Sequence, residues 1–526
     1  MVRLFLQAQG TGVIIKLQGR TSVDQSTGQL TTTFEEDPQL PLEDLKLTLN
    51  GGERAPLANP PTCGIPLRGT SRLTPYSSQT PAEPISEPFE VTACPPPLFS
   101  PTFIAGTTNN RAGAFSPEIV SFARTDQSQD FEGITLHTPP GLLGMLSHVA
   151  LCQEPQAQAG ACAAQSQIGT TTVAAGPGSS PIYLAGKVFV TGPYEGAPFG
   201  LSILVPAVAG PFNLGNVDIR AAIAVDPRTA ALTIHSDPLP QSLDGIPLQI
   251  KRVDLSLDRE AFMFNPTNCR PMVVNATLRS AQGMTAAVAS PFQAASCGAL
   301  PFKPRLLALT EARTSRARGA SLHVKVASAA GQANIAKVKV DLPRQLPSRL
   351  TTLQNACLAD VFDANPAECP AASVVGMATV VTPVLRSALD GPAYVVSHGS
   401  SAFPDLEIVL QGEGVALVID SHTTIRRGIT SSTFSSVPDV PISTFDLVLP
   451  EGAHSVLAAN IPARAKGSMC RQGLAMPTAM TAQNGAIKRQ VTRIAVSGCA
   501  TARRASRRKR ARNAAAEGHR RRPKER

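Results

Sequence analysis

Apolar and polar positions alternate along much of this chain, and turn-forming residues interrupt the alternation at short intervals. Valine, isoleucine and threonine are abundant in the alternating segments, which favours strands over helices. The most apolar stretch, residues 199–212, is broken by Pro206 and Gly210, so it predicts buried strands that meet at a turn. The pattern therefore predicts an all-β protein made of many short strands.

Helical spacing occurs next to particular cysteines. Leu346, Leu350 and Leu353 recur at helical spacing just before Cys357, and residues 141–151 occupy the same place upstream. This spacing predicts a short helix that packs on the sheet and ends at the cysteine. A second cysteine follows a short loop, so we expect a small helical knob closed by a disulfide.

The alternating segments form a repeat of about 200 residues. Residues 34–47 and 434–447 carry the same spacing of proline and apolar positions, and residues 162–169 match 369–376 position by position. Each repeat divides into an A half, which holds the knob, and a B half, which holds a longer cysteine loop. The order along the chain is B, A–B, A–B and a tail.

We predict tandem disulfide-stapled immunoglobulin-like β-sandwich domains, with a short helical knob in alternate domains. Whether the A and B halves fold separately or as one interlocked unit is left open by the sequence. The expected units are a partial repeat at 1–98, A halves at 99–215 and 301–415, B halves at 216–300 and 416–501, and a basic tail at 502–526.

The chain begins within a repeat, and a half-domain would leave unpaired strand edges. Residues 1–7 also lack the uninterrupted apolar run and cleavage site of a secretory signal. We therefore expect residue 1 to be internal to a longer gene product whose signal peptide lies upstream.

Composition agrees with a chain of several small β domains. The 526 residues are 43% hydrophobic, with no Trp, 40 Gly and 46 Pro, which suits short strands joined by turns. The whole net charge of +10 equals that of the tail 503–526, which holds twelve Lys/Arg and two Glu. The remaining body is neutral and poor in aromatic residues, so we expect no nucleic-acid partner.

The basic tail is the strongest charge signal of the chain. Its functional interpretation is adsorption to an acidic cell-wall polymer or a membrane surface, and the alternative is a disordered, solubilising end. The residues assigned to surface tethering are Arg503, Arg504, Arg507, Arg508, Lys509, Arg510, Arg512, Arg520, Arg521 and Arg522.

All ten cysteines fall into pairs that recur with the repeat. No C-x-x-C motif is present, so disulfides are favoured over a metal site, and we expect an oxidising, extracellular or cell-surface location. The expected pairs are Cys63–Cys94, Cys152–Cys162, Cys269–Cys297, Cys357–Cys369 and Cys470–Cys499.

No catalytic motif emerges from the remaining polar residues. Ser397-His398-Gly399 is the one hydrolase-like spot, but the chain has no G-x-S-x-G elbow and we interpret His398 as a loop residue at a strand end. The acidic clusters at 35–37 and 254–260 lack the ladder of a calcium loop, so solvated turn charges are expected there. We predict no catalytic residue, metal or cofactor.

Several segments resemble repeat-bearing secreted or cell-surface proteins of actinobacteria, a group with no assigned activity. The resemblance covers residues 1–500 and rests on 190–201, 205–212, 264–267 and 397–399, while residues 461–468 look like additional sequence. It implies a secreted location and no particular ligand.

The sequence therefore predicts a secreted or cell-surface repeat protein with a structural or adhesive role and no catalysis. Its partner would be an unknown protein or glycan. The alternative is an extracellular polymer-acting hydrolase or glycan-binding protein, which would require paired carboxylates brought together in a cleft.

Overall fold

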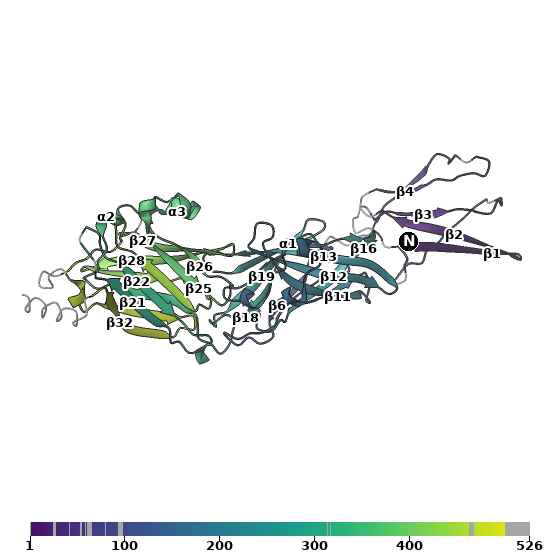
Figure 1. Cartoon of the computed structure of the whole chain (residues 1–526). Helices are drawn as coiled ribbons and strands as arrows, with labels where there is room; N and C mark the ends of the chain where they lie inside the picture. Colours follow the sequence, from purple (N-terminus) through teal and green to yellow (C-terminus); the bar gives the residue numbers. More distant parts are fainter. Residues whose placement is uncertain are drawn as a thin grey trace, which may run out of the picture.

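A computed structural model describes all residues of the chain except 1, 25–27, 42, 53–54, 58, 60–65, 79, 93–97, 313, 316, 400, 462–467 and 500–526. Two large curved sheets and a smaller N-terminal sheet follow one another along an elongated molecule (Figure 1). Within the described part of the chain, no helix is long and apolar enough to cross a bilayer. The all-β class predicted from the alternation is confirmed.

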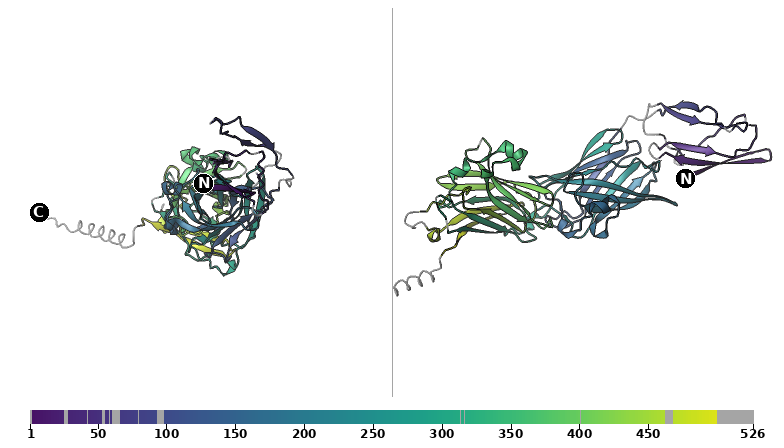
Figure 2. Two further views of the ribbon diagram at one scale, coloured as in Figure 1. Left: turned by 90° about the vertical axis from the view of Figure 1, so that its right-hand side faces the viewer. Right: turned by 45° about the horizontal axis from the view of Figure 1, so that its top comes forward.

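The first large sheet, called barrel 1, has eleven strands in the order β20-β19-β8-β14-β13-β12-β11-β10-β17-β7-β6. Its outermost strands meet, because Ser290 Oγ on β20 donates a hydrogen bond of 2.8 Å to the Ala105 oxygen on β6. The end-on view shows the resulting ring (Figure 2). The strands are β6 (Thr102–Thr107), β7 (Glu118–Ala123), β8 (Phe131–His137), β10 (Gln167–Ala175), β11 (Ile182–Thr191), β12 (Phe199–Ala209), β13 (Phe212–Val225), β14 (Leu232–Ser236), β17 (Ile250–Leu257), β19 (Met272–Ser280) and β20 (Thr285–Phe292).

The second large sheet, barrel 2, has the order β24-β26-β25-β30-β22-β21-β32-β31-β23-β29-β28-β27 and is closed by pairing of β26 with β27. Read from β26, this order repeats that of barrel 1 read from β11, and β24 is an addition. The strands are β21 (Arg305–Glu311), β22 (Leu322–Ala327), β23 (Ile335–Asp341), β24 (Cys357–Leu358), β25 (Val374–Val381), β26 (Leu389–Ser397), β27 (Asp405–Gly412), β28 (Val415–Arg426), β29 (Ile429–Phe434), β30 (Thr444–Leu449), β31 (Ala475–Ala482) and β32 (Ile487–Ser497).

The A and B halves of each repeat share one sheet. In barrel 1, β17 from the B half lies between β10 and β7 from the A half, and β8 from the A half lies between β14 and β19. The A and B halves are therefore one interlocked unit and not two separate domains. The two layers expected of a sandwich are opposite walls of one barrel.

Strict alternation along the strands decides which side chains enter the barrel interior. On β12, Phe199, Leu201, Ile203, Val205 and Ala207 face inward, two residues apart, as the period of a strand requires. The same spacing on the neighbouring β13 places Val217, Ile219, Ala221, Ile223 and Val225 inside. Each wall therefore presents an apolar inner face.

Four of the five expected disulfides lie within the described residues: Cys152–Cys162, Cys269–Cys297, Cys357–Cys369 and Cys470–Cys499. Cys63 and Cys94 lie outside the described residues. Together with the barrels, these bonds confirm the prediction of a disulfide-stapled all-β fold with short helices.

The helical knobs differ from the expectation in one respect. The helix before Cys357, α2 (Leu350–Leu353), is a single turn. Leu346 is buried before this helix begins, and Leu350 is 77% exposed, so the leucines at helical spacing do not form one buried face. The longer helix α3 (Ala359–Ala364) lies inside the disulfide loop, as does α1 (Glu154–Gln158) in barrel 1. The 3-10 turns are Leu146–His148, Ala164–Ser166, Cys297–Ala299, Pro366–Glu368, Ala371–Ser373 and Met469–Arg471.

The N-terminal sheet is a partial copy of the barrel wall. Strands β1 (Val2–Gly10), β2 (Val13–Val23) and β3 (Leu30–Phe34) pair in order, as β12, β13 and β14 do in barrel 1. Val23 lies against Gly245, where an added methyl group would overlap it. This sheet therefore adjoins the end of barrel 1 that carries β15 (Ser242–Leu243) and β16 (Ile246–Pro247), while β4 (Leu67–Ser71) and β5 (Ile85–Phe89) form a separate hairpin.

A buried carboxyl group joins the two barrels. Asp439, between β29 and β30 of barrel 2, is 3% exposed and lies against the segment of barrel 1 between β18 (Met263–Phe264) and β19. It accepts hydrogen bonds from Thr267 N and Oγ1 at 2.8 and 2.6 Å, and from Asn268 N and Nδ2 at 3.2 and 3.0 Å. Asn334 Nδ2 of barrel 2 adds a bond of 2.8 Å. These contacts hold the barrels end to end.

Candidate functional site

One cavity of about 430 Å³ is lined by inward-facing residues of both barrels. In barrel 1 its wall runs along β12 and β13, from Ala207 and Val217 near the N-terminal sheet to Phe199 and Ile223 near barrel 2. In barrel 2 it continues along β22, β27, β28 and β30, with lining residues that include Val324, Leu410, Leu417 and Leu447. The cavity is therefore elongated along the axis that the two barrels share.

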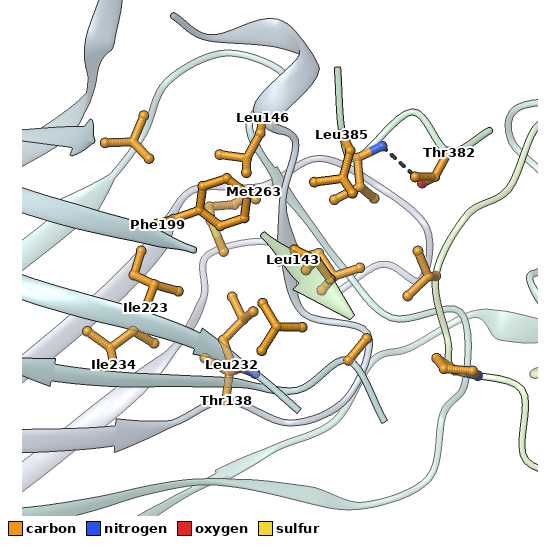
Figure 3. A pocket seen from close by; sticks show the side chains of 18 of the residues that line it. Thr138, Leu143, Leu146, Phe199, Ile223, Leu232, Ile234, Met263, Thr382 and Leu385 are labelled. Atoms are coloured by element: carbon orange, nitrogen blue, oxygen red, sulfur yellow. Dashed lines mark hydrogen bonds between the residues drawn. The ribbon is translucent and has the colours of Figure 1, made fainter. Parts of the chain in front are cut away.

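The cavity crosses the junction between the barrels. Leu143, Leu146 and Phe199 of barrel 1 and Leu385 of barrel 2 surround the same space (Figure 3). The loop before Leu385 docks on barrel 1, because Ser147 N donates a hydrogen bond of 3.2 Å to the backbone oxygen of Val384. Side chains from both repeats therefore form this part of the wall.

Three of the hydroxyl groups in the wall are hydrogen-bonded to nearby backbone. Thr138 Oγ1 accepts a hydrogen bond from Leu232 N at 3.1 Å, and Ser236 Oγ accepts one from Ile134 N at 3.1 Å. Thr171 Oγ1 donates to the Asp254 oxygen at 2.9 Å. Since these groups already have partners, they leave the interior predominantly apolar.

Glu118 is the exception in this wall. It is the first residue of β7, shares the inward side with Val120 and Phe122, and is 3% exposed. Among the described residues, none donates a hydrogen bond to its Oε1. Burial raises the pKa of Glu118 to about 7, because a charged carboxylate is poorly solvated in this apolar space.

The repeat shows what the fold itself requires at this position. Glu118 pairs with Leu257 on the neighbouring strand of barrel 1, and the corresponding pair in barrel 2 is Leu322 with Leu449. Leu322 is buried like Glu118 and lines the same cavity. The barrel therefore accommodates leucine at this position, and the carboxyl group is particular to barrel 1.

The hydrolase-like spot lies on the outer face of barrel 2. His398 directly follows β26, and its Nε2 lies 2.6 Å from Glu407 Oε1 on β27. Leu406 and Leu410 of β27 line the cavity, so the alternating Glu407 lies on the opposite, outer side of the strand. Burial and the nearby Asp420 raise the pKa of Glu407. The structure thus places His398 at a strand end beside a carboxyl group and away from the cavity.

The acidic clusters at 35–37 and 254–260 contain ion pairs. Glu35 lies 3.9 Å from Arg20, and Asp254 lies 2.8 Å from Arg252. Within the described ranges, no three His, Cys, Asp or Glu side chains gather closely enough to hold a metal ion. The predicted tethering residues, Arg503 to Arg522, lie outside the described residues.

Sequence reasoning missed Glu118, although a signal was present. Glu118, Val120 and Phe122 stand two residues apart, with the same spacing as Leu322, Val324 and Val326 one repeat later. Aligning these two strands places a carboxyl group opposite a leucine within an inward-facing series. The sequence does not show that both strands line the same cavity, and this fact makes the carboxyl group unusual.

Comparisons with known proteins carry no functional information for this chain. No family model matches it, and no curated protein is similar to it. Among solved structures, a proposed membrane-anchored protein from Corynebacterium diphtheriae is 9% identical over 82% of this chain and 95% of that chain, with a TM-score of 0.16. This score is too low to indicate a shared fold.

Proposed function

We propose that this protein binds a long hydrocarbon chain, such as the acyl chain of a lipid, inside its two coaxial barrels. The observation that carries the proposal is the apolar cavity shared by both barrels, whose volume of about 430 Å³ is within the range of small-molecule sites. Apolar cavities exclude water and accept apolar ligands. Each methylene group transferred from water into such a space contributes about 0.8 kcal/mol.

The shape of the cavity favours a linear ligand. Its wall on β12 extends from Phe199 to Ala207, which corresponds to roughly 26 Å along the strand at about 3.3 Å per residue. The lining then continues into barrel 2 past Leu385. An extended hydrocarbon chain fills an elongated space of this kind better than a compact ligand does.

Filling part of the cavity should weaken binding. We expect Ala221→Phe, on the inward side of β13, to weaken the affinity for a fluorescent long-chain fatty acid by at least about tenfold, since a ring that displaces two methylene groups removes roughly 1.6 kcal/mol. Fluorescence titration of the purified full chain measures this effect.

The same strand supplies the control for this experiment. Ala224 is exposed on the outer side of β13, so Ala224→Phe adds the same ring without entering the cavity and should leave the affinity unchanged. Equal affinities for both variants, with unchanged melting temperatures, would contradict binding inside the barrel.

The location and the absence of catalysis are part of the same proposal. Four disulfides support an oxidising location outside the cytosol. A polymer-acting hydrolase would need two carboxyl groups in one cleft. Among the described residues that line this cavity, Glu118 supplies the single carboxyl group, so we propose binding and no reaction.

We further propose that the basic tail tethers the protein to an acidic cell-wall polymer or membrane surface. Each basic residue near an anionic surface contributes about 1 kcal/mol, and salt screens this attraction. Removing residues 503–526 should move the protein from the envelope fraction to the medium, and high salt should release the full chain in the same way. Unchanged fractionation after both treatments would contradict tethering.

A surface array of this kind would also present loops for adhesion to a protein or glycan. The disulfide loop that carries α3 stands on the outside of barrel 2 (Figure 1) and contains Leu358, which is 64% exposed. This loop is the element that supports an adhesive role as the second candidate function.

A further inference from the structure

We propose that Glu118 forms a polar subsite in the cavity and binds a hydroxyl group carried by the hydrocarbon chain of the ligand. This inference deepens the proposed function and rests on it. Its basis is a buried carboxyl group in the predominantly apolar wall, whose Oε1 has no hydrogen-bond partner among the described residues. A ligand without a hydrogen-bonding group would leave that oxygen unsatisfied.

The fold gives no reason to place a carboxyl group at this position. Burying a polar group without a partner is unfavourable, and the equivalent wall position in barrel 2 is filled by Leu322. Local rules of this kind are broken mainly at functional sites, where the unfavourable placement serves a ligand. Glu118 therefore has the character of a binding residue rather than a packing residue.

The chemistry of the site favours an uncharged hydroxyl group over an ion. An alcohol can donate a hydrogen bond to Glu118 and accept one from its protonated form. A carboxylate or an ammonium ion would need further buried partners, and the hydroxyls of Thr138, Thr171 and Ser236 are already engaged with the backbone. A hydroxyl group can be satisfied by Glu118 alone.

The position of Glu118 places this hydroxyl within the chain rather than at its end. Ser116, two residues before Glu118, donates from its backbone N to the Met263 oxygen at 3.1 Å, close to the junction between the barrels. The cavity continues from there toward Ala207 in barrel 1 and toward Leu410 in barrel 2. The ligand class is thus a long acyl chain with a hydroxyl near its middle.

The test is displacement of a fluorescent fatty acid by octadecanoic acid and by its 2-, 10- and 12-hydroxy derivatives. The quantity compared is the affinity for a hydroxy derivative divided by the affinity for octadecanoic acid. For the 10- or the 12-hydroxy derivative, we expect this ratio to be roughly fivefold to tenfold higher in the wild type than in Glu118→Leu, which is the effect of one hydrogen bond. The 2-hydroxy derivative should show no such difference.

Two variants make the result interpretable. Glu118→Leu reproduces the residue that barrel 2 already carries at the equivalent position, so it should fold. Glu118→Gln keeps hydrogen-bonding capacity and should retain part of the preference. Identical preferences in the wild type and Glu118→Leu would overturn the role of Glu118 while leaving acyl binding intact. Failure of every protein to bind any of these acids would overturn the proposed function itself.

Discussion

Replacing Glu118 with leucine is expected to change the free energy of unfolding more favourably at pH 8 than at pH 4. The difference between the two pH values is about 3 kcal/mol. Burial raises the pKa of Glu118 from 4.5 to about 7, with no charged neighbour contributing. Between pH 4.5 and about pH 7, Glu118 is therefore protonated in the folded protein and already deprotonated in the unfolded chain.

The sign of the effect follows from this difference in proton binding. Where the folded state binds more protons than the unfolded state, raising the pH lowers the free energy of unfolding. The contribution of neutral Glu118 is thus fully present below about pH 4.5 and is lost by about pH 7. Leucine does not titrate, so the variant lacks this loss.

Chemical denaturation of both proteins at several pH values between 4 and 8 measures the effect, and the difference between their curves cancels the other titrating groups. Glu118→Gln serves as the control, because it also lacks a titrating group while keeping a polar side chain of similar size. Parallel curves for the wild type and Glu118→Leu would show that water in the cavity solvates the carboxylate.

Replacing Asp439 with alanine is expected to lower the free energy of unfolding by about 3 to 5 kcal/mol. The carboxyl group accepts five hydrogen bonds, four of them from Thr267 and Asn268 in the other barrel. Alanine would leave these donors buried without an acceptor, and each such group carries a desolvation cost.

Calorimetry of the purified chain tests this expectation, because loss of the junction should separate the melting of the two barrels. Asp446→Ala is the matched control. Asp446 bonds to His323 and Lys325 on the partly exposed outer face of barrel 2, where removing a carboxyl group should change stability by less than about 1 kcal/mol. Equal melting curves for the two variants would contradict a structural role of Asp439 at the junction.

Asn265 supports the segment of barrel 1 that reaches the junction. Asn265 Nδ2 donates to the backbone oxygens of Asn109 and Arg111 at 2.7 and 3.0 Å. It thereby helps to hold the segment that presents Thr267 to Asp439. The partners of Asn265 lie more than 150 residues away along the chain, so no local pattern indicates them.

Local features were accessible from the sequence alone. Alternation marked the strands and their apolar sides, as in the series from Phe199 to Ala207, because side chains of a strand alternate between its faces whatever that strand pairs with. The recurring cysteine spacings indicated the four disulfides that the structure describes, since pairs within short loops need no knowledge of distant segments.

Only the tertiary structure determined which residues line the interior of the barrels. Strand β8 pairs with β19, and Asp439 bonds to Thr267, 172 residues away. Such contacts depend on how the whole sheet closes, which no local pattern specifies. Closure brings apolar faces of distant strands around one cavity, and burial in its wall leaves Glu118 Oε1 without a hydrogen-bond partner among the described residues. The sequence by itself determined the strands and their two faces, whereas the site exists because distant strands close around a shared interior.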